Sequence, residues 1–122
     1  KFFIKNFLNN KSKMIPPSLN EFSYFLVGIL GILEEVLFRG FMTLLCFASS
    51  HLIITATGLI LVNLVFALSH INFGYRHVGT KMILGTVCLF SFLSLGSICM
   101  PIAIHTTFNL LAIKKIRESY HV

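Results

Sequence analysis

Long apolar stretches without charge dominate this chain. Residues 40–75 and 82–113 contain no Lys, Arg, Asp or Glu, and each stretch exceeds the roughly 20 apolar residues that a helix needs to cross a bilayer. Strands are not expected, because no period-2 alternation appears and unpaired strand edges cannot face lipid. The pattern predicts an all-α polytopic bundle of about four transmembrane helices.

Turn residues divide the apolar pattern into these helices. The first is expected from residue 19 to about 50, after a capping box of Ser18 and Glu21. The second is expected over 57–72 and the third over 82–95, with a polar loop at 72–81 between them. Gly96, Ser97 and Pro101 mark a tight turn before a fourth helix that ends near residue 113.

Composition excludes a small soluble domain. The 122 residues are 56% hydrophobic and 11% charged, whereas a soluble domain carries about a quarter charged residues. The expected division is a basic cytoplasmic segment over 1–18, a membrane core over 19–115 and a cytoplasmic tail over 116–122. Since the chain begins with Lys instead of Met, it is expected to be a fragment.

The positions of the basic residues set the expected orientation. Nine of the ten Lys and Arg lie before the first helix, in the middle loop or after the last helix: Lys1, Lys5, Lys11, Lys13, Arg76, Lys81, Lys114, Lys115 and Arg117. This bias is typical of cytoplasmic segments and argues against a nucleic-acid partner despite the net charge of +6. Both termini are therefore expected on the cytoplasmic side of a bacterial membrane.

Three charged residues interrupt the first helix: Glu34, Glu35 and Arg39. Each costs about 2.5–3.5 kcal/mol near the centre of a membrane helix, so the three together cost about 8–10 kcal/mol. The apolar residues of that helix return about 5–9 kcal/mol, which is about as much. Charges of this kind need partners inside the protein and mark a functional site. Glu35 and Arg39, four residues apart, have the favourable order for an ion pair.

Glu34 has no such local partner, because it lies about 100° around the helix from Glu35. A carboxylate in apolar surroundings holds a proton more readily than one in water, which suits a general base. The alternative is that both glutamates form buried structural ion pairs.

Two histidines on other helices complete the candidate set. His70 ends the second apolar run with Phe66 one turn before it, and His105 and Asn109 have the same spacing on the fourth helix. At about 1.5 Å per residue, Glu34 and His105 lie at nearly the same depth, whereas His70 lies nearer the cytoplasm.

These residues form a pattern that resembles the CPBP family of intramembrane proteases, which includes CAAX proteases, bacteriocin-processing proteins and Abi-like proteins. Three motifs carry the resemblance: EExxFRG at 34–40, FxxxH at 66–70 and HxxxN at 105–109. The resemblance covers roughly residues 20–115.

The resemblance implies an endopeptidase in which Glu34 activates a water, helped by His70. It implies that His105 and Asn109 stabilise the oxyanion of the peptide carbonyl, that Glu35 and Arg39 hold the geometry, and that no cofactor takes part. Phe66 is expected to pack behind His70. The substrate would be a membrane-anchored peptide or protein: a prenylated CAAX tail, a bacteriocin leader or a sorting tail.

Two alternatives remain. In one, Glu34, His70 and His105 bind zinc, although the chain has no HExxH motif. In the other, the protein is a non-catalytic membrane adaptor or immunity protein that binds a peptide in the same cavity.

Overall fold

The protein is described by a computed structural model of residues 21–120, and within this range it consists of helices without strands. A long first helix is made of α2 (Glu21–Glu35), a π-helical segment η1 (Val36–Met42) and α3 (Thr43–Cys46). It is followed by α4 (Leu52–Leu68), a short 3-10 turn η2 (Ile71–Phe73), α5 (Tyr75–Leu95) and α6 (Cys99–Tyr120). The prediction of an all-α fold is confirmed.

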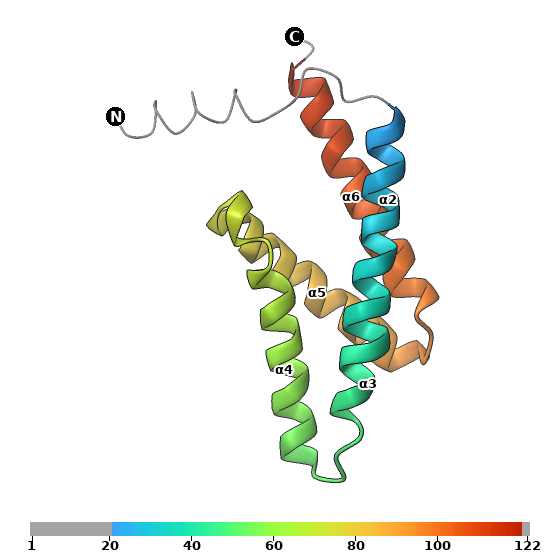
Figure 1. The fold of residues 1–122 in the computed structure, drawn as a ribbon, viewed down its shortest axis with the longest axis vertical. Helices are drawn as coiled ribbons and strands as arrows, with labels where there is room; N and C mark the ends of the chain where they lie inside the picture. The colour runs from blue at the N-terminus through green and yellow to red at the C-terminus, as the bar shows by residue number, and fades with distance from the viewer. Residues whose placement is uncertain (1–20, 121–122) are drawn as a thin grey trace, which may run out of the picture.

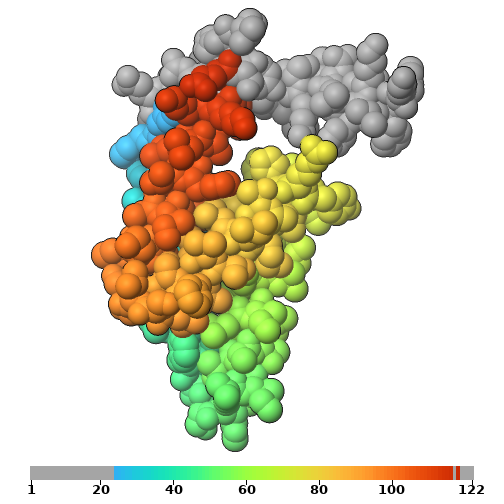
Figure 2. Space-filling model, turned by 180° about the vertical axis from the view of Figure 1, so that it is seen from behind, coloured from blue at the N-terminus to red at the C-terminus, as the bar shows by residue number. Residues whose placement is uncertain are grey.

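The helices pack as two connected hairpins. α2 lies along α6, α5 packs against both α4 and α6, and η1 and α3 contact α4. The beginning of α2 and the end of α6 lie at one end of the bundle, whereas the α3–α4 turn lies at the other (Figure 1). Seen from behind, α5 runs between α6 and α4 (Figure 2). The bundle thus brings side chains from four sequence segments together at its centre.

The exterior of the described part is strongly apolar. Large side chains point outward along the helices, with Leu52 and Phe90 exposed to 82% and 72%. Such an extended apolar surface is unusual for a protein in water. By length and composition, α5 is the helix among those described that could cross a membrane, whereas the apolar α4 is shorter, with 17 residues.

Several predicted helix boundaries were wrong. α4 begins at Leu52 instead of residue 57 and ends at Leu68 instead of residue 72. The largest error concerns the polar loop expected at 72–81, because α5 already begins at Tyr75. The first turns of α5 carry polar residues on their exposed face, and a run of polar residues is also typical of a loop. α6 begins at Cys99 and continues to Tyr120, so residues 116–120 of the expected tail extend this helix.

The turn between α5 and α6 was predicted correctly. Gly96 follows α5 in the left-handed conformation (φ 62°), and its N–H donates to the Phe92 carbonyl. Glycine is the residue that best tolerates this helix-ending geometry. Pro101 falls in the first turn of α6, where a missing N–H costs no helical hydrogen bond. The expected basic segment 1–18 and the Ser18 cap lie outside the described residues.

A π-helical segment directly follows the two glutamates. The wider π-helical turn of η1 changes the regular pairing of the backbone groups. The Thr43 hydroxyl donates to one of its carbonyls, that of Phe38, at 2.8 Å. Segments of this kind are rare in proteins, and those that occur often lie at functional sites. Here η1 carries Arg39, whose side chain is buried at the centre of the bundle.

Gly85 on α5 allows the closest approach of helices at this centre. A methyl group added there would fall against Asn63 Oδ1 and within 2.9 Å of both Arg39 Nη2 and Phe66 Cδ1. Gly79, six residues earlier on α5, has open space around the same position.

We expect Gly85→Ala to destabilise the bundle by about 1–3 kcal/mol, the usual cost of overpacking a filled core. Gly79→Ala is the matched control and should be neutral or slightly stabilising, because alanine favours a helix. Unfolding of both variants in mixed micelles, followed by circular dichroism, measures the difference. Equal stability of the two variants would contradict the close packing at Gly85.

Candidate active site

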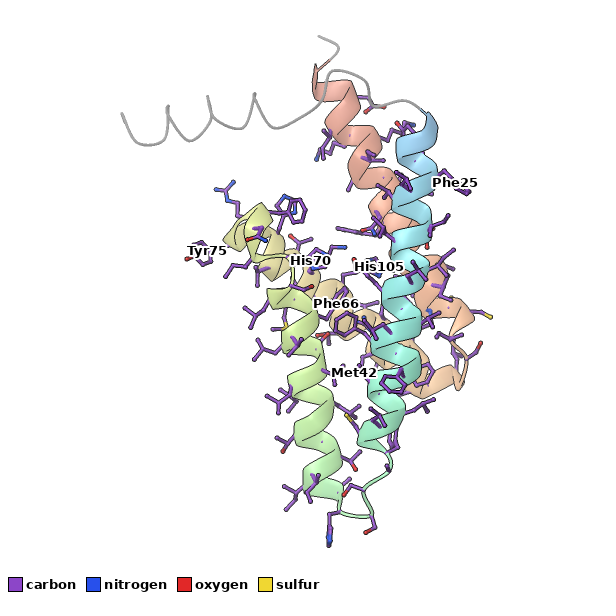
Figure 3. All side chains as sticks on the ribbon, viewed as in Figure 1. Phe25, Met42, Phe66, His70, Tyr75 and His105 are labelled. Carbon is purple, nitrogen blue, oxygen red and sulfur yellow. The ribbon has the colours of Figure 1, made fainter. Side chains whose placement is uncertain are left out.

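The candidate site is a polar centre in an otherwise apolar bundle. Phe66, His70 and His105 lie together between α4 and α2, about midway along the molecule (Figure 3). Glu35, Arg39 and His105 are among the most deeply buried side chains of the described part. Because a buried polar group is costly without a partner, their contacts decide what the site can do.

Glu35 is fully enclosed and holds two partners through one oxygen. Its Oε1 accepts from Arg39 Nη1 at 3.2 Å and lies 2.6 Å from His105 Nδ1. Arg39, 2% exposed, also donates through Nη2 to the Gly85 carbonyl at 2.8 Å. The i, i+4 ion pair expected from the sequence is therefore present, and it ties α2 to both α5 and α6.

Glu34 points to a different part of the site, between two imidazoles. Its Oε1 lies 3.7 Å from His70 Nε2, and its Oε2 lies 3.3 Å from His105 Nε2. The side chain is 29% exposed, yet Oε2 is buried and has no hydrogen-bond partner among the described residues. Glu34 is thus the less constrained of the two acids and the one open to a small molecule.

His70 lies just beyond the end of α4, and its proton can be assigned from its neighbours. Its Nδ1 lies 3.0 Å from the Phe66 carbonyl, which can only accept a hydrogen bond. In the neutral ring Nδ1 therefore carries the hydrogen, and Nε2 faces Glu34 as an acceptor. Two acceptors cannot hydrogen-bond to each other, but a water between them can donate to both, and the distance of 3.7 Å suits such a bridge.

Phe66 packs at the middle of this arrangement with no exposed surface. Its ring lies edge-on to His70 and His105, with centroids 5.4 and 5.5 Å away, and the Arg39 guanidinium lies 4.4 Å from its centroid. The ring thus packs against both imidazoles. A cation over an aromatic face also stabilises the buried charge of Arg39.

Lys81 is a site residue that the sequence analysis missed. It was placed in a cytoplasmic loop, but it lies in α5, is 8% exposed, and joins the buried face. Its Nζ lies 2.9 Å from His105 Nε2 and donates to Asn109 Oδ1 at 2.9 Å. The buried positions of α5, namely Lys81, Leu84, Gly85 and Cys88, have the spacing of one helix face, and this signal could have found it.

Asn109 lies one turn after His105 on α6, and Lys81 fixes its orientation. Lysine is only a donor, so the amide oxygen must face it, and the amide nitrogen remains available as a donor. Gly31 on α2 leaves room for this amide, because an added methyl group would lie 3.4 Å from Asn109 Nδ2. All the predicted site residues are therefore within one cluster.

A cation lies beside the donors of the zinc alternative, Glu34, His70 and His105. Among residues 21–120, no three His, Cys, Asp or Glu side chains form a cluster that could hold a metal. The Lys81 ammonium lies against His105 Nε2, the nitrogen that zinc would need. A cation in that position competes with a metal for the same lone pair.

Fold and site together define a helical bundle with a buried centre of acids, imidazoles and cations. Residues 17–111 match the family model for type II CAAX prenyl endopeptidase Rce1-like proteins. The chain belongs to this family, a membrane-embedded one, and its general class is that of a CAAX-type intramembrane endopeptidase. The resemblance to CPBP proteases is confirmed. No curated protein and no solved structure gives a significant match to the chain.

Proposed function

We propose that this protein hydrolyses a peptide bond of a membrane-associated or lipidated peptide with a water activated by Glu34. The observation that carries the proposal is the pair of acceptors formed by Glu34 Oε1 and His70 Nε2, 3.7 Å apart. A water donating to both would have its lone pairs directed away from them, toward a substrate carbonyl.

The reaction proceeds in two steps. Glu34 takes a proton from the water while the water oxygen attacks the carbonyl carbon, which gives a tetrahedral oxyanion and a protonated Glu34. The oxyanion then collapses, the C–N bond breaks, and Glu34 returns the proton to the leaving amine. The negative charge develops on the side of the site where Asn109 keeps its amide N–H groups, and preorganised donors there stabilise it.

Glu35 and Arg39 are positioning residues in this mechanism. The Glu35 carboxylate holds His105 through Nδ1, and Arg39 holds Glu35 in turn. Such a chain of contacts fixes the ring that faces the substrate, much as outer partners orient a catalytic imidazole. Neither Glu35 nor Arg39 needs to touch the substrate.

The expected surroundings follow from the family and from the charges. We propose a bacterial cytoplasmic membrane, with both termini on the cytoplasmic side and the lipid bilayer and an anchored peptide as partners. The shared end of α2 and α6 (Figure 1) and the basic residues near that end support this orientation. Nucleic acid has no part in the proposal.

Cleavage of a farnesylated CAAX peptide by the purified protein in proteoliposomes tests the proposal. We expect mass spectrometry to find the prenylated cysteine product. We also expect the rate to stay within about 2-fold when a strong chelator is added, since the Lys81 ammonium lies against His105 Nε2, the nitrogen that zinc would need. A bacteriocin-leader peptide and a membrane-anchored sorting tail are the parallel substrates. Loss of activity on chelation, restored by zinc, would overturn the metal-free mechanism.

A further inference from the structure

Lys81 has an unusual position for a lysine, inside the bundle and beside the proposed catalytic groups. Lysine is almost never buried without a charged or polar partner. Among the described residues the centre holds two carboxylates, Glu34 and Glu35, and two cations, Arg39 and Lys81. Because Arg39 is paired directly with Glu35, Lys81 is the cation that balances Glu34 and any negative charge formed near it.

The positions of the hydrogens on the His105 ring decide which groups near His105 can donate a hydrogen bond to a substrate oxygen. Glu35 Oε1 accepts from Arg39 and is therefore an acceptor, so His105 Nδ1, 2.6 Å from it, carries a hydrogen. In the neutral ring Nε2 then has a lone pair and accepts from Lys81 at 2.9 Å. His105 consequently has no N–H left to offer a carbonyl oxygen.

Among the described residues that contact His105 or Asn109 here, Lys81 and Asn109 keep free donors. Lys81 uses one N–H on His105 Nε2 and a second on Asn109 Oδ1, which leaves the third. Asn109 keeps its amide N–H groups, since its oxygen faces Lys81. The ammonium is held by two fixed acceptors, so it needs no rearrangement when charge develops on the substrate.

We propose that the Lys81 ammonium, together with the Asn109 amide, donates to the oxyanion of the tetrahedral intermediate, and that His105 is a positioning residue for Lys81. This inference rests on the proposed hydrolysis by Glu34-activated water. A full positive charge in a site of low dielectric stabilises an oxyanion more than a neutral donor does. The N–H of Lys81 donates to the oxyanion and keeps its proton when the intermediate collapses.

Kinetics on the farnesylated CAAX peptide in proteoliposomes test this role. Lys81→Met removes the charge at similar length, and we expect kcat to fall about 10²–10³-fold while KM stays within about 2-fold. Lys81→Arg keeps the charge and should lose less than the methionine variant. Lys114→Met is the matched control, because Lys114 is 65% exposed in a surface ion pair with Glu118, and it should keep the wild-type kcat.

Nitrogen NMR of ¹⁵N-histidine-labelled wild-type protein gives a readout independent of activity. We expect His105 with a hydrogen on Nδ1 and an unprotonated Nε2, and a change in the Nε2 shift in Lys81→Met. A protonated Nε2 in the wild type, or an unchanged kcat in Lys81→Met, would overturn the role of Lys81. An active Glu34→Gln variant would instead overturn the proposed hydrolysis, so the two failures are distinguishable.

Discussion

Replacing Glu34 with glutamine is expected to lower kcat for peptide cleavage by about 10²–10⁴-fold, the usual contribution of a general base. Glutamine has nearly the same shape but cannot take a proton from the bridging water. Glu34 is also the partly exposed acid, without the enclosed hydrogen bonds of Glu35, so the fold should tolerate the change. Product formation is measured by mass spectrometry, and stability by unfolding in mixed micelles.

Glu118→Gln is the matched control for this variant. Glu118 lies on the exposed part of α6, 66% exposed and 3.9 Å from Lys114, so losing its charge should leave kcat unchanged. Wild-type cleavage by Glu34→Gln would contradict the role of Glu34 as base. If the protein were an adaptor or immunity protein, Glu34→Gln would leave its protective effect intact, and a protection assay in cells makes that distinction.

Arg39→Met is expected to have the largest effect on stability, about 3–5 kcal/mol, because it removes one partner of a buried ion pair. Glu35 has no exposed surface, so water cannot replace the guanidinium as the partner of its carboxyl group. The variant also removes the hydrogen bond from Arg39 Nη2 to the Gly85 carbonyl and the cation from the face of Phe66. The midpoint of unfolding with increasing SDS in mixed micelles measures the loss.

Two further variants show whether the unpaired charge is the cause. The double variant Arg39→Met, Glu35→Gln removes both charges and should be more stable than Arg39→Met alone. Arg76→Met changes an exposed arginine at the start of α5 and should stay within about 0.5 kcal/mol of the wild type. If Arg39→Met were as stable as Arg76→Met, the buried pair would not be holding the bundle together.

The candidate residues could be identified from sequence because charged and polar groups are conspicuous in apolar helices. Glu34, Glu35 and Arg39 stand out by their cost in a membrane, and the i, i+4 rule gives the Glu35–Arg39 pair. These inferences use only the local geometry of a helix. They do not say which groups from other helices complete the site.

The contacts between helices could not be predicted from the sequence. Counting residues along straight helices left His70 nearer the cytoplasm than Glu34, yet the structure brings the two within 3.7 Å. The α3–α4 hairpin extends farther along the long axis than the α5–α6 turn does (Figure 1), and this stagger brings His70 level with the site. The contact between Glu35 and His105 likewise depends on the packing of α2 against α6.

Lys81 shows why a charge pattern alone can mislead. A lysine next to Arg76 and His77 fits the rule for cytoplasmic loops, and that rule counts charges without regard to helix faces. The helical spacing of the buried residues of α5 instead indicates that Lys81 is buried, because Lys81 and Gly85 share one helix face. Where charge position and helical period disagree, the residue is a candidate for a buried functional role.

Single-turnover cleavage in H₂¹⁸O, with enzyme in excess over the farnesylated CAAX peptide, tests most directly whether Glu34 activates water. Direct attack by water predicts one ¹⁸O atom in the new carboxylate of the product and none in the enzyme peptide that contains Glu34. Attack by Glu34 itself would form an anhydride whose hydrolysis can place ¹⁸O in the Glu34 carboxylate and leave the product unlabelled. Finding ¹⁸O in Glu34 after one turnover, or product without the label, would contradict a hydrolytic water held between Glu34 and His70.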